Sequence, residues 1–274
     1  MNLQSTFQMN NGNQIPVMAM GSWDSRGREG YQACLDALEA GYRHLDTASY
    51  YENEAQVGAA VRDSRIPREE IFVTSKIWYT DMAEGKQEAA FEKTLKELDL
   101  EYLDLYLLHW PINDVAGSWK VLERYYEQGL IKNIGVSNFN ERHLKRLEQT
   151  ANIAPAVDQI EICPFLVQKD TVDYCKGQGI IVEAWGPLGK GKQLGEPEII
   201  KLAEKYKKTP AQIILRWHLQ RGIVSLPKSV HKERIISNGD IFDFELSEED
   251  MKLMFTMDHR AETGRGYPAE YRKE

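Results

Sequence analysis

Short apolar runs recur along the chain, and each is followed by a longer amphipathic stretch. The runs have the length of buried strands, whereas the stretches between them space their apolar residues three or four positions apart, as helices do. The runs cover residues 17–21, 43–45, 71–75, 103–108, 131–136, 156–159, 180–184 and 223–226. This alternation predicts parallel strands joined by helices, in a (β/α)8 TIM barrel or in an open doubly wound sheet.

Local signals sharpen this pattern at several places. The helical period is clearest in two sets of aligned apolar side chains, Phe91, Leu95 and Leu98 in one and Trp119, Leu122 and Tyr126 in the other. Thr209, Pro210 and Gln212 predict a helix start, because Thr caps the helix, Pro suits its first turn and Gln reaches back. Residues 7–18 predict a β-hairpin with a tight turn at Asn11–Gly12 or Gly12–Asn13, which would cap one end of a barrel.

The length and composition favour one globular domain over residues 1–274, because no linker divides the chain. A net charge of -8 disfavours non-specific nucleic-acid binding. No apolar run is long enough to span a membrane and the N-terminus lacks a leader pattern, so we expect a cytoplasmic protein without membrane contact.

Three widely spaced cysteines, Cys34, Cys163 and Cys175, show no CxxC pair and no zinc-ligand spacing. We expect reduced, buried thiols and no metal site. Cys163 ends a strand-like run and remains a candidate nucleophile, although Pro164 follows it and no motif supplies a base.

Polar side chains with reactive groups stand where three of the predicted strands end. Asp46, Lys76 and His109 follow successive apolar runs, and Tyr51 lies in the loop five residues after Asp46. Taken alone, each of these residues would be interpreted as a helix cap, a turn residue or a surface side chain. In a parallel barrel, however, all strand ends meet at one face, where active sites form.

These four groups together suit the reduction of a carbonyl. An ammonium beside a phenol stabilises the phenolate and lowers a pKa that is normally about 10, and a carboxylate keeps the ammonium charged and in place. A histidine can hydrogen-bond the carbonyl oxygen while hydride reaches the carbon and a proton reaches the oxygen. This chemistry requires no metal.

The segments GYRHLDTASYYENE, IFVTSKIW, YLDLYLLHWPI and GVSNF resemble the aldo-keto reductases, which are NADPH-dependent carbonyl reductases built on a (β/α)8 barrel. The resemblance extends from the hairpin to about residue 257. It implies that Tyr51 is the general acid, that Lys76 and Asp46 tune it, and that His109 orients the substrate. Tyr50 adjoins Tyr51, but the family spacing from the aspartate selects Tyr51.

The hydride must come from a cofactor, because no side chain supplies one, and the early chain lacks GxGxxG. The segment LPKSVHKERIISN can grip a phosphate by charge, hydroxyl and helix N-terminus, and it resembles the family segment for the adenosine 2′-phosphate, which favours NADPH. Two interpretations remain for Lys190 and Lys192: a second contact to a phosphate, or solvated charges on the surface. The cofactor residues implied by the resemblance are Ser137, Asn138, Gln159, Trp185, Gly186, Leu188, Lys228, Ser229, Val230, Arg234 and Asn238.

The substrate mouth implied by the same resemblance is lined by Trp23, Trp78 and Trp110, beside Tyr51 and His109. Trp185 replaces a tyrosine frequent in the family, as in the branch of the bacterial 2,5-diketo-D-gluconate reductases and prostaglandin F synthases. Residues 111–118 and the tail 258–274 are short where animal members carry longer specificity loops. We therefore expect an open pocket and broad substrate choice.

The leading hypothesis is a monomeric NADPH-dependent reductase of small aldehydes, ketones or dicarbonyls. One alternative is a regulatory barrel that binds cofactor but turns over little substrate. Another is an aldolase or isomerase that uses Lys76 in a Schiff base, which requires a neutral lysine that Asp46 would work against.

Overall fold

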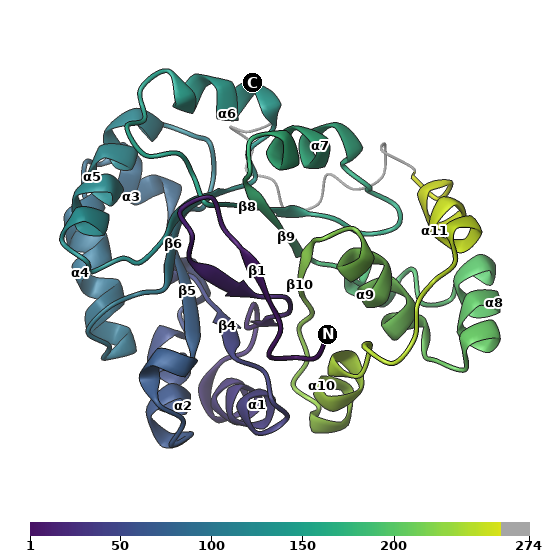
Figure 1. The fold of residues 1–274 in the computed structure, drawn as a ribbon. Coiled ribbons are helices and arrows are strands. Elements are labelled where there is room, and N and C mark those ends of the chain that lie inside the picture. Colours follow the sequence, from purple (N-terminus) through teal and green to yellow (C-terminus); the bar gives the residue numbers. More distant parts are fainter. Residues whose placement is uncertain (259–274) are drawn as a thin grey trace.

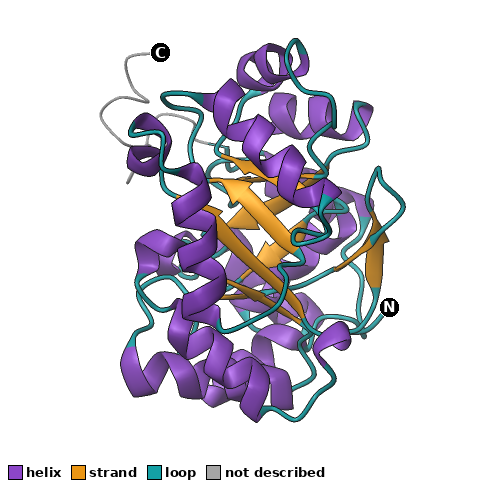
Figure 2. Ribbon diagram, turned by 90° about the vertical axis from the view of Figure 1, so that its left-hand side faces the viewer, coloured by secondary structure: helices purple, strands orange, loops and turns teal. Residues whose placement is uncertain are grey.

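The computed structural model describes residues 1–258 and consists of eight parallel strands surrounded by helices (Figures 1 and 2). The strands follow one another around the sheet in chain order. They are β3 (Met20–Gly21), β4 (His44–Asp46), β5 (Phe72–Ile77), β6 (Leu105–Leu108), β7 (Ile134–Ser137), β8 (Val157–Glu161), β9 (Ile181–Trp185) and β10 (Val224–Leu226). Each predicted apolar run contains or overlaps one of these strands.

The first and last strands of the sheet meet, so the sheet is a nearly closed barrel. The backbone N–H of Ala19 donates to the carbonyl of Ser225 at 2.9 Å, and that of Gly21 donates to the carbonyl of Pro227 at 3.1 Å. Met18 and Ser225 also form a parallel bridge. The choice left open by the sequence is therefore decided in favour of the (β/α)8 barrel over an open sheet.

Helices connect the strands and cover the outside of the barrel (Figure 1). They are α1 (Gly27–Glu39), α2 (Glu54–Asp63), α3 (Tyr79–Ala83), α4 (Gln87–Leu98), α5 (Val115–Glu127), α6 (Glu141–Glu148), α7 (Lys169–Gly177), α8 (Pro197–Tyr206), α9 (Pro210–Gln220), α10 (Lys232–Gly239) and α11 (Glu248–Phe255). On the predicted apolar faces of α4 and α5, Phe91, Leu98, Trp119 and Leu122 are buried, whereas Leu95 and Tyr126 are half-buried. The predicted start of α9 is confirmed, because Thr209 and Gln212 form a reciprocal capping box.

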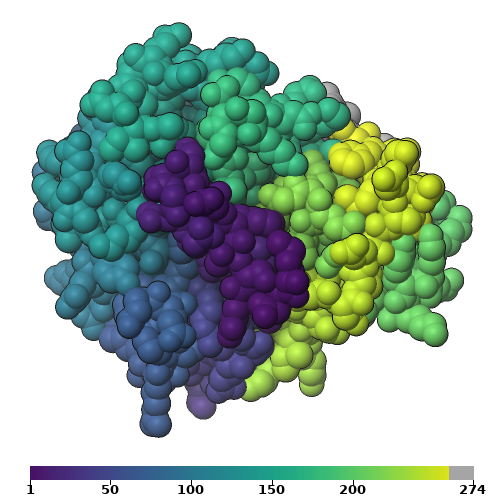
Figure 3. Space-filling view, in the orientation of Figure 1, coloured from purple at the N-terminus to yellow at the C-terminus, as the bar shows by residue number. Residues whose placement is uncertain are grey.

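The N-terminal hairpin is confirmed, and it lies across the barrel end that faces the viewer in Figures 1 and 3. Its strands are β1 (Thr6–Gln8) and β2 (Gln14–Pro16). The predicted position of the turn is wrong. The tight turn runs from Met9 to Gly12, whose N–H donates to the Met9 carbonyl at 3.0 Å. Gly12 then takes a φ of 88°, which glycine adopts without strain, and this brings the chain back into register.

The barrel interior changes in character from one end to the other. Toward the hairpin it is filled by an apolar cluster, whose members include Met9, Ile15, Phe72, Leu105, Leu107, Val157, Val224 and Leu226. Further along the same strands the buried side chains become polar or charged, and they are His44, Asp46, Thr74, Lys76, Gln159 and Glu183. Reactive groups are therefore concentrated toward the carboxyl ends of the strands.

The cysteines are free and buried, as expected. The thiol of Cys163 accepts a hydrogen bond from the Gln193 amide at 2.8 Å, and burial raises its pKa, so the structure does not favour a reactive thiolate there. Among residues 1–258 no helix is both long and apolar enough to cross a bilayer. Over the same residues, no cluster of three His, Cys, Asp or Glu side chains could hold a metal ion.

Candidate active site

Asp46, Tyr51 and Lys76 come together at the carboxyl end of the barrel strands. Lys76 is fully buried, and its Nζ lies 2.7 Å from Oδ1 and 2.8 Å from Oδ2 of Asp46. The same nitrogen donates to the Thr47 carbonyl at 2.8 Å and to the Tyr51 hydroxyl at 3.5 Å. The ammonium is thus held on one side by a carboxylate and faces a phenol on the other.

The loop after β4 holds Tyr51 in place through buried side-chain bonds. The Asn53 amide donates to the carbonyls of Ser22 and Ser25 at 2.8 and 2.9 Å, and its oxygen accepts from the Thr47 hydroxyl at 2.6 Å. The Ser49 hydroxyl, two residues before Tyr51, donates to the Lys76 carbonyl at 3.0 Å. These bonds tie the short 3-10 helix Ser49–Tyr51 to β5, so the phenol has little freedom to move.

The charges in this cluster set the protonation states of its members. Burial would lower the pKa of Lys76, but the neighbouring charges of Asp46 and Tyr51 raise it above its ordinary value, so the amine stays charged. Burial raises the pKa of Tyr51, and the Lys76 charge acts in the opposite direction. The expected net decrease for Tyr51 is therefore not found, because burial outweighs the ammonium. Tyr51 is a protonated phenol at neutral pH.

His109 lies directly after β6, beside Tyr51, with the two ring centres 5.8 Å apart. Burial, reinforced by the Lys76 charge, holds the pKa of His109 well below its usual range, so the imidazole is neutral. Its backbone carbonyl accepts a hydrogen bond from the Asn138 amide at 2.9 Å. A neutral imidazole can donate one hydrogen bond to an oxygen without competing for the proton of Tyr51.

Four residues predicted to bind the nicotinamide end of a cofactor form one hydrogen-bonded network. The Asn138 amide donates to the Ser137 hydroxyl at 3.1 Å, which in turn donates to the Gln159 carbonyl at 2.7 Å. The Trp185 indole donates to the Asn138 side-chain oxygen at 2.9 Å. Because Asn138 also contacts His109, the predicted cofactor residues adjoin the cluster of Asp46, Tyr51 and Lys76.

The predicted phosphate segment follows β10. Lys228 and Arg234 are exposed, and neither has an ion-pair partner within residues 1–258. The Ser229 hydroxyl accepts from the His231 N–H at 3.1 Å, at the start of α10. The other predicted contacts vary in exposure: Asn238 is buried, and Val230, Gly186 and Leu188 are half-buried. Two cations without ion-pair partners near a helix N-terminus fit a phosphate group.

An aromatic wall borders Tyr51 and His109. The Trp23 ring meets Tyr51 edge-on at 4.9 Å, Trp78 meets His109 at 5.0 Å, and Trp110 lies stacked 6.2 Å from His109. The structure therefore places the three predicted mouth tryptophans beside the reactive groups. Residues 259–274 of the tail, whose shortness underlies the predicted open pocket, lie outside the described residues.

Tyr50 is a member of this wall that the sequence analysis missed. Its ring stacks between those of Trp23, at 5.7 Å, and Trp78, at 3.9 Å, and it remains 47% exposed. An aromatic residue directly before the predicted catalytic tyrosine was the available signal. Its stacking partners come from two other loops, so the arrangement could not be read from the local sequence.

Glu183 and His44 were also missed, and they lie deeper in the barrel below Asp46. The Gln159 amide nitrogen donates to Asp46 Oδ2 and to Glu183 Oε2, both at 2.8 Å. Nδ1 of His44 lies 3.9 Å from Oε1 of Glu183. Gln159 thus connects the predicted catalytic aspartate to a second buried carboxyl.

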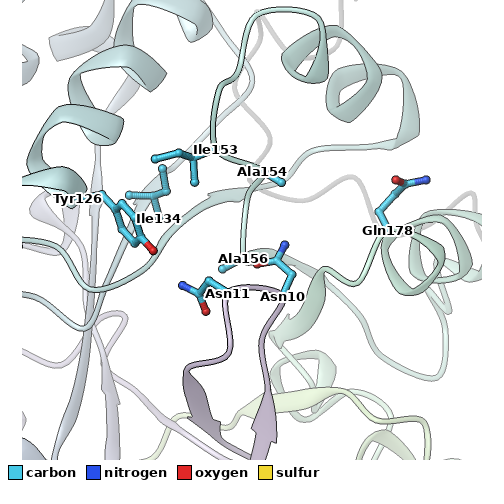
Figure 4. A pocket seen from close by; sticks show the side chains of 8 residues that line it. All are labelled: Asn10, Asn11, Tyr126, Ile134, Ile153, Ala154, Ala156 and Gln178. Carbon is cyan, nitrogen blue, oxygen red and sulfur yellow. The ribbon is translucent and has the colours of Figure 1, made fainter.

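A surface cavity of about 300 Å³ lies at the opposite end of the barrel, beside the hairpin turn (Figure 4). Its lining residues are Asn10, Asn11, Tyr126, Ile134, Ile153, Ala154, Ala156 and Gln178. No acidic or basic side chain is among these eight residues, all of which lie in the described part of the chain. The cavity therefore lacks the charged side chains that the cluster at the other end of the barrel contains.

The fold and the strand-end cluster define a class, the (β/α)8 barrels with a buried lysine and aspartate paired at the carboxyl ends of the strands. Residues 17–258 match the model of the Aldo/keto reductase family, and the chain belongs to that family. It is 48% identical over 251 residues, 91% of each chain, to a glyoxal reductase of Bacillus subtilis. It is 43% identical to a 9,11-endoperoxide prostaglandin H2 reductase of Trypanosoma cruzi, over 89% of this chain and 88% of that one.

A solved structure gives the same result. The crystal structure of an aldo-keto reductase from a Medee basin deep-sea metagenome library superposes with a TM-score of 0.92 at 42% identity. The match covers 97% of this chain and 98% of that one. The chain is therefore an oxidoreductase of a family that reduces small carbonyl compounds with a nicotinamide cofactor.

Proposed function

We propose that this protein reduces small aldehydes, ketones and dicarbonyls to alcohols with NADPH, and that Tyr51 is the general acid. The observation that carries the proposal is the position of Lys76, which lies fully buried between the Asp46 carboxylate and the Tyr51 hydroxyl. A charged ammonium at that position stabilises the phenolate that forms when Tyr51 gives up its proton.

The chain's own residues account for the proton in this reaction. A bound nicotinamide cofactor supplies hydride to the carbonyl carbon. The Tyr51 hydroxyl transfers its proton to the carbonyl oxygen, and the phenolate left behind is stabilised by Lys76 and then reprotonated from solvent. His109, being neutral, donates a hydrogen bond to the same oxygen and orients it. Asp46 keeps Lys76 charged throughout.

The residues present fit a cofactor with a 2′-phosphate. Ser137, Asn138, Gln159 and Trp185 would hold the nicotinamide end, while Lys228 and Arg234 would hold the phosphate beside the N-terminus of α10. Two exposed cations without carboxylate partners in the described chain support NADPH rather than NADH. Gly186, Leu188, Ser229, Val230 and Asn238 would complete the contacts.

Small dicarbonyls are the proposed substrates, because the wall of Trp23, Tyr50 and Trp78 is apolar and the groups beside it are polar. The similarity to a glyoxal reductase supports this choice. We also propose that the chain acts as a single-domain monomer, since the groups proposed for catalysis all lie at one end of a single barrel. Three free buried cysteines suit the reducing cytoplasm.

Schiff-base chemistry at Lys76 finds no support in this geometry. The nitrogen donates to both oxygens of Asp46 and to the Thr47 carbonyl, and its pKa is raised by the charges of Asp46 and Tyr51 against the effect of burial. A nucleophilic lysine must instead be neutral. Borohydride trapping with a carbonyl substrate should therefore leave no adduct on Lys76.

The direct test follows NADPH absorbance with methylglyoxal, comparing the wild type with Tyr51→Phe and with Tyr50→Phe as a matched control. Tyr51→Phe should lower kcat at least about a hundredfold, because general acid catalysis contributes about 10²–10⁴. NADPH affinity should be unchanged. Tyr50→Phe keeps the aromatic stack and should retain kcat within about threefold. Full turnover in Tyr51→Phe would contradict the assignment.

Cofactor choice has its own test in Lys228→Ala. Removing a cation that contacts the 2′-phosphate should raise KM for NADPH about tenfold and leave KM for NADH unchanged, because NADH lacks that phosphate. Lys232→Ala is a matched control, since Lys232 is already paired with Asp36 and Glu39. Equal changes for both cofactors would refute the role of Lys228.

A further inference from the structure

Glu183 is a fully buried carboxyl that the mechanism above does not use. It lies on β9 inside the barrel, and its Oε2 accepts a hydrogen bond from the Gln159 amide at 2.8 Å. The same nitrogen donates to Asp46 Oδ2 at 2.8 Å. A side-chain amide has two N–H bonds, so both donors of Gln159 are used, one on each carboxyl. Gln159 therefore fixes Asp46 relative to Glu183.

The ionisable groups around Glu183 come from two strands of the barrel, β4 and β5. β4 brings His44, whose Nδ1 lies 3.9 Å from Glu183 Oε1, together with Asp46. β5 brings Lys76, whose charge interacts with Glu183. β10, the neighbour of β9 on the other side, brings Val224, Ser225 and Leu226, none of which ionises, and it is fully described. Two carboxyls thus share one buried cation.

His44 does not supply a second cation. Burial, with a contribution from Lys76, lowers the pKa of His44 to about 3, and its Nε2 is hydrogen-bonded to the Thr74 hydroxyl at 2.8 Å. Burial and the nearby Asp46 charge raise the pKa of Glu183 to about 8. At neutral pH the interior therefore holds one carboxylate, one ammonium and a neutral Glu183, which is a balanced set.

We propose that Glu183 is a positioning residue of the reductase. In its protonated form it holds the Gln159 amide in hydrogen-bond contact with Asp46, and when it ionises it makes Tyr51 a weaker acid. The ionised form adds a second negative charge that interacts with the Lys76 ammonium. That charge offsets the field of the ammonium at the Tyr51 hydroxyl, so the phenolate becomes harder to form. The rate of carbonyl reduction then falls as Glu183 loses its proton, before Tyr51 itself titrates.

This inference rests on the proposed role of Tyr51, and its test measures the pH profile of Glu183→Gln. Glutamine keeps the shape and the acceptor oxygen but cannot ionise. The kcat for methylglyoxal at saturating NADPH should match the wild type near pH 7. At pH 9, about one pH unit above the titration of Glu183, the variant should be about tenfold faster, because about nine-tenths of the wild type is then ionised.

Asp158→Asn is the matched control. Asp158 is a buried carboxyl on β8, and burial also raises its pKa, but its side chain accepts a hydrogen bond from the Cys175 thiol and not from the Gln159 amide. Its variant should keep the wild-type pH profile. A Glu183→Gln profile that stays parallel to the wild type, with turnover intact, would overturn the role of Glu183 alone.

A second readout does not depend on turnover. The infrared spectrum of the wild type at pH 7 should contain a protonated-carboxyl band that disappears on titration to pH 10 and is missing in Glu183→Gln but present in Asp158→Asn. Finding no band assignable to Glu183 would overturn the proposal. A wild type that shows the band but reduces no carbonyl would instead overturn the assignment of Tyr51, and with it the effect on rate.

Discussion

The two ends of the barrel interior are built on the same strands but with opposite chemistry. At the hairpin end, Phe72, Leu105 and Val157 fill the interior with apolar volume. At the other end, Asp46 and Lys76 bury charges that depend on each other and on Gln159. Strand β5 shows this change within a few residues. Its alternate positions Phe72, Thr74 and Lys76 are apolar, polar and charged in turn.

This difference indicates which substitutions each end of the barrel tolerates. An apolar side chain is stabilised by the area that it removes from water and does not need one particular partner. A buried charge is tolerated only while its partner remains, because an unpaired charge in the interior is costly. The hairpin end should therefore control stability alone, whereas changes at the charged end should affect stability and turnover together.

The largest effect is expected from Lys76→Met. It should abolish turnover and also lower the free energy of unfolding by about 3–5 kcal/mol, because Asp46 is left buried without its cation. The double variant Asp46→Asn with Lys76→Met should recover part of that stability and none of the activity. Urea unfolding and NADPH oxidation measure the two quantities, and a double variant no more stable than the single one would contradict this account.

Leu105→Ala tests the apolar end. Leu105 is fully buried in the cluster beneath the site, so its truncation should cost about 2–5 kcal/mol of stability through lost burial and the cavity left behind. Below the unfolding transition, kcat/KM should remain within about twofold of the wild type. A loss of kcat comparable to that of Lys76→Met would show that the two ends are not separable.

Glu183→Gln sharpens the comparison through the pH dependence of stability. The ordinary pKa of the carboxyl is 4.5, and burial together with Asp46 raises it to about 8 in the folded state. Between these values the unfolded chain releases a proton that the folded chain retains, so the wild type loses stability as pH rises, by up to about 1.4 kcal/mol per pH unit.

Glutamine at position 183 has no proton to release, so the variant does not lose stability in this way. Its free energy of unfolding relative to that of the wild type should increase from pH 5 to pH 8 and then stay constant. Urea midpoints at pH 5.5, 6.5 and 7.5 measure it, and a constant difference across that range would count against the raised pKa.

The smallest effect is expected from Gly12→Ala in the hairpin turn. A Cβ there would meet no atom within 4 Å, so only the positive φ of 88° opposes the change. The expected cost is about 1 kcal/mol of stability with unchanged kinetics. Thermal unfolding measures it, and an altered KM would mean that the hairpin end communicates with the site.

Much of the architecture could be predicted from the sequence because its signals are local. Periodicity marks strands and helices, and the capping pair of Thr209 and Gln212 marks the start of α9 within four residues. The sequence also allowed the prediction that Asp46, Lys76 and His109 lie close together, because the ends of parallel strands meet at one face of a barrel. The family resemblance then selected Tyr51 from two adjacent tyrosines.

What could not be predicted depends on how distant strands align. The bridge of Gln159 between Asp46 and Glu183 requires the register of β4, β8 and β9, which no local pattern encodes. The pKa of Tyr51 was misjudged because the sequence shows its cation but not the depth of its burial. The hairpin turn was misplaced because the run from Asn10 to Asn13 offers several turn dipeptides.

The aromatic wall has a practical consequence for anyone working with this protein. The chain contains six tryptophans, of which Trp23, Trp78, Trp110 and Trp185 contact Tyr51, His109 or Asn138. Trp119 and Trp217 are sealed within the helical shell. Intrinsic fluorescence is thus weighted toward the site, so quenching of emission by a ligand can titrate occupancy without a label, while the two sealed indoles provide a steady background.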